Sequence, residues 1–146
     1  MTVVVGVDGS PDSYAAIRLA HEEASYRGVR LVAVMAYSGD SALGAPAARP
    51  LSALRSPGDE QKAAESMLRQ TVRKAIGDEA EKVELLAVPG VPGRVLVEAA
   101  RTLNAGMVVL ATRGEHTARL LGAVSQFVLR HAPCPVLVVP EASKGL

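Results

Sequence analysis

Val3-Val4-Val5-Gly6-Val7, followed by Asp8-Gly9-Ser10-Pro11, is the stretch that decides the fold of this chain. The first five residues are β-branched or small and do not alternate with polar ones, which is typical of a strand buried on both faces of a parallel sheet. Ser10 and Pro11 are typical of a helix start, with the serine as N-cap and the proline in the first turn. A buried strand that turns directly into a helix predicts a layered α/β fold.

The same alternation continues along the chain. Strands are expected over residues 3–7, 29–37, 83–88, 107–111 and 135–139. Helices are expected over residues 11–27, 59–76, 95–103 and 122–132. Because crossovers between parallel strands are right-handed, this order predicts a doubly wound parallel sheet with helices on both faces. A chain of 146 residues fits one domain, so we expect residues 1–146 to form a single unit.

The composition excludes several classes of function. Hydrophobic residues make up 49% of the chain and charged residues 21%, as in a compact protein. A net charge of +1, with three tyrosines, one phenylalanine and no tryptophan, is poorly suited to binding nucleic acid. The one cysteine, Cys134, cannot form an internal disulfide, and no apolar run approaches the roughly 20 residues that span a bilayer. We therefore expect a cytoplasmic protein that binds neither nucleic acid nor membranes.

Ligands of doubly wound sheets bind beyond the carboxyl ends of the strands. The loops expected there are residues 8–12, 37–58, 89–93 and 111–121, of which 37–58 is long enough to be either functional or flexible. The chain has no dinucleotide-binding glycine motif, no P-loop, no nucleophile elbow and no histidine or cysteine pairs at metal-ligand spacing. The sequence therefore offers no candidate catalytic residues and no metal site.

A phosphate site is one interpretation of the loop after the fourth predicted strand. Ala111-Thr112-Arg113-Gly114 leaves that strand, and Gly122-Ala123-Val124-Ser125 opens the next helix, where unpaired N–H groups and the helix dipole favour an anion. Ordinary turns use the same glycines, and Ser125 is equally consistent with a hydroxyl that bonds its own backbone. Asp8 either accepts a hydrogen bond from a base or ribose, or caps a turn.

Two segments of the sequence resemble the bacterial universal stress protein family. They are Val3-Val4-Val5-Gly6-Val7-Asp8-Gly9-Ser10, and the run from Gly122-Ala123-Val124-Ser125 to His131-Ala132-Pro133-Cys134-Pro135-Val136-Leu137-Val138-Val139. The resemblance covers nearly the whole chain. It implies a Rossmann-type sheet of the adenine-nucleotide-hydrolase kind, with strand order 3-2-1-4-5. It also implies a stress-response role and a homodimer through the last strand, Pro135 to Val139.

The family contains members that bind ATP and members that do not, and the resemblance implies where a nucleotide would lie. Val7 and Asp8 would lie beside the adenine, with Ala36 on its other side. The phosphates would lie near the backbone of the loop and helix start that follow the fourth strand, at Gly114, Gly122, Ala123, Val124 and Ser125.

The phosphate-binding pattern of the family is not intact in this chain. Ala111 stands where binding members have glycine, Ala123 where they have Ser or Thr, and the spacer from Glu115 to Leu121 is shorter than theirs. A hydrogen bond to a charged group contributes about 1.5–3 kcal/mol, so losing the hydroxyl at position 123 would weaken binding by about 10- to 100-fold. Positive charge from Arg113 would offset part of this loss.

Three hypotheses for function follow. The first is a non-enzymatic stress-response homodimer with a weak or vestigial adenine-nucleotide pocket that acts through protein partners. The second is a switch in which ATP or AMP, with Mg²⁺ accompanying the nucleotide, orders loops 38–57 and 111–121 and so controls partner binding. The third is hydrolysis of ATP or another phosphate ester. For this reaction the sequence shows neither a general base nor a set of arginine and metal ligands near the phosphates.

The last predicted strand favours self-association, because the strand order that the resemblance implies puts it at an edge of the sheet. Pro135 to Val139 is apolar and is expected at a sheet edge, and such edges are normally paired or covered. Pairing with a second copy across a two-fold axis would satisfy the edge. The alternative is that residues 140–146 fold over it.

Overall fold

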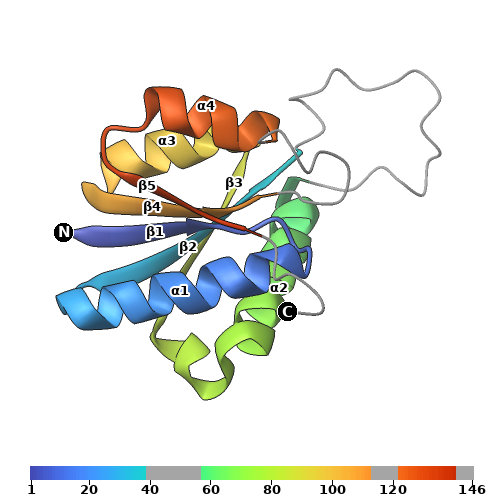
Figure 1. Cartoon of the computed structure of the whole chain (residues 1–146). Coiled ribbons are helices and arrows are strands. Elements are labelled where there is room, and N and C mark those ends of the chain that lie inside the picture. Colours follow the sequence, from blue (N-terminus) through green and yellow to red (C-terminus); the bar gives the residue numbers. More distant parts are fainter. Residues whose placement is uncertain (39–56, 113–121, 141–146) are drawn as a thin grey trace.

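The computed structural model describes residues 1–38, 57–112 and 122–140. Within them, five strands form one parallel sheet in the order β3-β2-β1-β4-β5 (Figure 1). The strands are β1 Thr2–Gly6, β2 Arg30–Tyr37, β3 Glu84–Pro89, β4 Ala105–Ala111 and β5 Val136–Val139. The helices are α1 Asp12–Arg27, α2 Pro57–Ile76, the 3-10 helix η3 Gly77–Lys82, α3 Pro92–Thr102 and α4 Ala123–His131. The predicted doubly wound fold and its strand order are confirmed.

The sheet lies between two helical layers, with α1 and α2 on one face and α3 and α4 on the other (Figure 1). Val3, Val4 and Val5 of β1 are all fully buried. Val3 and Val5 pack into the core beneath α1 and α2, whereas Val4 packs into the core beneath α3 and α4. The central strand thus meets an apolar layer on each face, which explains why its sequence shows no polar alternation.

The start of α1 differs from the prediction. The helix begins at Asp12, its N-cap is Pro11, and no side chain bonds the cap. The Ser10 hydroxyl is instead 2.6 Å from Asp8 Oδ1, to which it donates a hydrogen bond. The prediction that Ser10 caps the helix was therefore wrong, because the carboxylate two residues earlier takes its hydroxyl.

The connection between α2 and β3 was also predicted incompletely. Gly77 ends α2 with a left-handed φ of +63°, as expected of a glycine in this position. The chain then forms η3, which the sequence analysis did not anticipate, and only Ala80 of this short helix is buried. One buried alanine in six residues produces no helical periodicity in the sequence.

The other element boundaries differ from the predicted ones by a few residues. None of the helices in the described ranges is long and apolar enough to cross a membrane. Loops 39–56 and 113–121, together with the chain end 141–146, lie outside the described residues.

Candidate functional site

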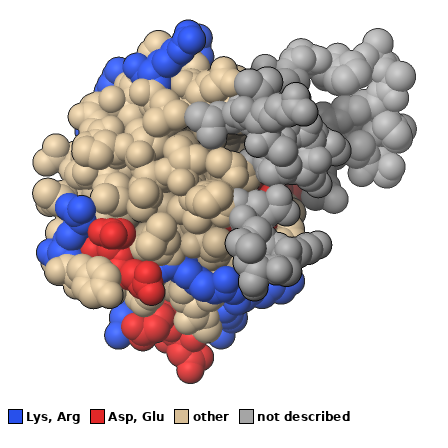
Figure 2. All heavy atoms as spheres, in the orientation of Figure 1, with Lys and Arg blue, Asp and Glu red and all other residues tan. Residues whose placement is uncertain are grey.

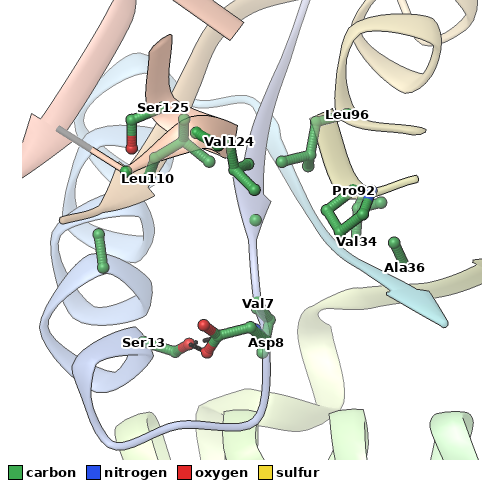
Figure 3. Close-up of a pocket in the computed structure, with 14 residues that line it drawn as sticks. Val7, Asp8, Ser13, Val34, Ala36, Pro92, Leu96, Leu110, Val124 and Ser125 are labelled. Carbon is green, nitrogen blue, oxygen red and sulfur yellow. Dashed lines mark hydrogen bonds between the residues drawn. The ribbon is translucent and has the colours of Figure 1, made fainter. Parts of the chain in front are cut away.

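A cavity of about 300 Å³ opens at the carboxyl ends of β1, β2 and β4, beside the first turns of α3 and α4. The winding of the sheet reverses between β1 and β4, since β1 leads to β2 and β3 on one side while β4 leads to β5 on the other. Ligands of such sheets bind at this reversal. The cavity is lined by Gly6, Val7, Asp8, Ser13, Val34, Ala36, Pro92, Leu96, Leu110, Ala111, Gly122, Ala123, Val124 and Ser125 (Figure 3).

A hydrogen-bonded turn after β1 fixes the position of the Asp8 carboxylate. Asp8 Oδ1 accepts hydrogen bonds from the Ser10 backbone N–H at 2.9 Å and from the Ser10 and Ser13 hydroxyls at 2.6 and 2.9 Å. The Asp8 N–H in turn donates to Ser13 Oγ at 3.3 Å. Ser13 is only 2% exposed, so α1 holds this carboxylate from a rigid position at one end of the cavity (Figure 3).

The amino end of α4 forms another part of the cavity wall. Its N-cap, Gly122, is extended with φ −65° and ψ 165°, and no side chain bonds the cap. The first turn of α4 carries no acidic residue, so nothing there opposes the positive end of the helix dipole. Ser125 is 4% exposed and lines the cavity from this turn. The arrangement suits an anion bound by backbone N–H groups.

Apolar walls connect the two polar ends of the cavity. Leu96 from α3 and Leu110 from β4 close around Gly6, where a β-carbon would lie 2.9 Å from Leu96 Cδ1 and 2.7 Å from Leu110 Cδ2. The missing side chain at Gly6 lets both leucines approach the backbone of β1. The site therefore has an apolar body, a carboxylate at one end and helix amides at the other, which suits a flat apolar group linked to an anionic one.

The structure brings together most of the residues predicted for the site. The cavity contains Val7, Asp8, Ala36, Gly122, Ala123, Val124 and Ser125. Arg113 and Gly114 lie outside the described residues. The turn after β1, the end of β4 and the first turn of α4 therefore line one cavity.

Several lining residues were missed by the sequence analysis. Ser13, Val34, Pro92, Leu96 and Leu110 belong to helix and strand interiors or to a helix start. Their apolar or helical pattern is that of ordinary core residues, so the sequence gives no sign that they line a cavity. Ser13 carried the one usable signal, since a serine in the first turn of a helix, five residues after Asp8, can reach back to that carboxylate.

The described residues offer no candidate metal centre. No cluster of three or more His, Cys, Asp or Glu side chains that could hold a metal ion occurs in the described ranges. His21 of α1 is only partly exposed, and its Nε2 atom lies 3.7 Å from Glu79 Oε1. Burial raises the pKa of the Cys134 thiol, which keeps it in the less nucleophilic protonated form.

Comparison with known proteins shows which family the chain resembles. The sequence model of the universal stress protein family matches residues 1–140. A universal stress protein of Mycobacterium tuberculosis is 33% identical over 147 residues, which cover 96% of this chain and 45% of that protein. One from Thermus aquaticus is 32% identical over 141 residues, covering 94% of this chain and 97% of the relative. The chain thus spans about half the length of the mycobacterial relatives that it matches.

Solved structures show the same fold. A universal stress protein in complex with cAMP is 28% identical, with a TM-score of 0.68 over 97% of this chain and 98% of the other. The protein UspA from Lactobacillus plantarum is also 28% identical, with a TM-score of 0.73 over 95% and 97% of the two chains. Three findings indicate the same family: the family match over residues 1–140, the relatives above 30% identity and the shared strand order. The chain therefore belongs to the universal stress protein family.

Proposed function

We propose that this chain is a non-enzymatic stress-response protein of the cytoplasm that binds an adenine nucleotide weakly and acts on protein partners as a homodimer. The observation that carries the proposal is the cavity itself. It joins the Asp8 carboxylate to the amino end of α4, yet Ala123 presents a methyl group where a hydroxyl would serve a phosphate.

The nucleoside end of the proposed site has suitable chemistry. Val7 and Ala36 supply apolar surface for a base, and Asp8 is a carboxylate acceptor for hydrogen bonds from a base or a ribose. A cavity of about 300 Å³ lies at the lower end of the range for small-molecule pockets, which favours a ligand of nucleoside size over a larger one. The cAMP complex of the 28% identical structure supports an adenine nucleotide with one phosphate.

The phosphate end of the proposed site is weaker. The first turn of α4 offers backbone N–H groups and the helix dipole, which together attract an anion. Ala123 adds no hydrogen bond, and a bond of this kind to a charged group contributes about 1.5–3 kcal/mol. A nucleotide is therefore held mainly by its nucleoside, and added phosphates strengthen binding little.

Isothermal titration calorimetry with adenosine, AMP and ATP-Mg tests the proposal. The proposal predicts dissociation constants for adenosine and ATP-Mg that differ by less than about tenfold. Nucleotide carried through purification and released on denaturation would contradict the weak site. Absence of heat and of a thermal shift at millimolar ligand would contradict binding altogether, because a ligand that binds only the native state raises its apparent stability.

The second candidate is a switch, in which occupancy by ATP or AMP controls partner binding. The open cavity favours the switch function, because a pocket that no longer bound a ligand would have no reason to stay open. The loops that would respond lie outside the described residues. A pull-down of partners in the presence and absence of millimolar AMP separates the two functions, because only the switch predicts a nucleotide-dependent set of partners.

The proposed homodimer uses the free edge of β5. In the described part of the chain, β5 pairs only with β4. The Pro135 carbonyl accepts a hydrogen bond from Val108 N–H of β4, and the Val139 carbonyl accepts one from Thr112 N–H, just after β4. Because backbone groups alternate along a strand, those of Val136 and Val138 point away from β4. Figure 2 shows a broad uncharged area on the face of the molecule that includes α4 and β5. An apolar edge with few charges favours pairing with a second copy.

A further inference from the structure

Met67 of α2 lies against the turn that carries Asp8. Gly9 has a left-handed φ of +84°, and a β-carbon placed on it would be 2.7 Å from Met67 Sδ and 3.9 Å from Met35 Cε. The thioether of Met67 thus fills the space where any other residue at position 9 would have a side chain. Met67 is at the same time 51% exposed.

The turn supported by this sulfur carries one end of the proposed site. Gly9 lies between Asp8 and Ser10, and Ser10 donates two of the hydrogen bonds that fix Asp8 Oδ1. A shift of the backbone at Gly9 therefore changes the orientation of the carboxylate in the cavity. Met67 does not line the cavity itself, so its influence passes through this turn.

We propose that Met67 is an oxidation-sensitive modification site that controls the nucleotide cavity. A hydroperoxide such as hydrogen peroxide transfers one oxygen atom to Sδ. A sulfur–oxygen bond forms, the peroxide O–O bond breaks, sulfur loses two electrons, and the peroxide is reduced to water. The product, methionine sulfoxide, is polar and can be reduced back enzymatically, so the modification is reversible.

The position of Met67 distinguishes it from the other three methionines. Met35 is 3% exposed and Met107 is partly buried in the same core. Met1 is 68% exposed, but its sulfur packs against Gly106, at the amino end of β4 and away from the cavity. Only Met67 combines exposure with contact to the turn.

Oxidation removes the apolar contact whichever way the new oxygen points. Turned inward, the oxygen meets the Gly9 backbone. Turned outward to water, it draws the sulfur away from Gly9 and leaves the turn unsupported. Loss of one hydrogen bond to the Asp8 carboxylate corresponds to about a tenfold weaker site. This inference rests on the proposed function, because the affinity that falls is that for an adenine nucleotide.

The test compares the unmodified chain with Met67→Leu, which keeps the apolar contact and cannot be oxidised at sulfur. Both are treated with hydrogen peroxide, the oxidised methionines are identified by peptide mass spectrometry, and AMP affinity is measured by calorimetry. Treatment is expected to weaken AMP binding by about tenfold in the unmodified chain and to leave Met67→Leu unchanged. Because both proteins carry Met1, Met35 and Met107, the variant controls for oxidation elsewhere. The inference is overturned if AMP affinity is unchanged while Met67 is oxidised. It is also overturned if the unmodified chain and Met67→Leu lose AMP affinity equally.

A second measurement separates this inference from the proposed function. Nuclear magnetic resonance of the untreated and oxidised proteins, without nucleotide, reports the amide resonances of Gly9, Ser10 and Ser13. The inference predicts that these resonances shift on oxidation of the unmodified chain, shift similarly in Met67→Gln without oxidant, and stay fixed in treated Met67→Leu. Absence of AMP binding before treatment would refute the proposed function alone, whereas absence of these shifts would refute the role of Met67.

Discussion

Restoring a hydroxyl at position 123 is the sharpest perturbation of the proposed phosphate end. Ala123 is exposed, begins α4 and lines the cavity, so Ala123→Ser adds a donor without displacing a packed group. The hydroxyl adds one hydrogen bond to a charged phosphate, about 1.5–3 kcal/mol, and AMP binding is expected to strengthen by about 10- to 100-fold.

Adenosine provides the matched ligand control for this variant. It has no phosphate, so its affinity for Ala123→Ser is expected to equal its affinity for the unmodified chain. Ala63→Ser serves as the control variant, because Ala63 is an exposed alanine of α2 that does not line the cavity. Isothermal titration calorimetry measures adenosine and AMP binding to the unmodified chain and to both variants.

Two results would refute the reasoning. If Ala123→Ser strengthened adenosine and AMP equally, the new hydroxyl would act on the nucleoside or on the fold, and α4 would not face the phosphate. If it strengthened neither, the amino end of α4 would not contact the ligand. An effect of Ala63→Ser would show that the gain is not specific to the cavity.

Four further outcomes are expected. Gly9→Ala should destabilise the fold more than Gly28→Ala in urea unfolding. Both glycines have a left-handed φ, which costs an alanine roughly 1–2 kcal/mol, but only the new methyl group at position 9 would also press on Met67. Equal losses of unfolding free energy would contradict the Met67 contact. Asp8→Ala should lower unfolding free energy by about 1–3 kcal/mol, because the nearly buried Ser13 hydroxyl loses its acceptor; an unchanged midpoint would argue against that network. Val138→Pro should shift a dimer to monomer in sedimentation velocity while leaving the circular dichroism spectrum intact, since the proline removes an N–H that points away from β4; a persistent dimer would place the interface elsewhere. The raised thiol pKa of Cys134 should make its alkylation at about pH 8 slower than that of a cysteine in an unfolded peptide, with the rate rising as the pH increases further; equal rates would contradict burial of the thiol.

The sequence predicted the fold well because β1 carries an unambiguous local signal. Three consecutive buried valines in β1 require apolar layers on both faces, and right-handed crossovers leave few alternatives to a doubly wound sheet. The strand order was inferred from the family resemblance and not from these patterns. The 3-10 helix was missed because its sequence has no apolar periodicity, and the N-cap was wrong because the Ser10 hydroxyl bonds Asp8 instead.

The candidate site was only partly predictable, because some of its residues look like ordinary core residues in the sequence. Asp8 and the start of α4 stand out in the sequence because they follow strand ends and break the apolar pattern. Leu96 and Leu110 look like any core leucine, and their role as cavity walls appears only when α3 and β4 are packed around Gly6. Met67 fits the apolar face of α2 in the sequence, and its contact with Gly9 depends on how that helix meets the turn after β1.

A crystal structure of the chain grown with saturating ATP-Mg tests the central claim most directly. The account predicts a well-ordered adenosine between Asp8 and Ala36, with its first phosphate near the amino end of α4 and the outer phosphates poorly ordered. An empty cavity, a nucleotide bound elsewhere, or a triphosphate held rigidly along its whole length would contradict it.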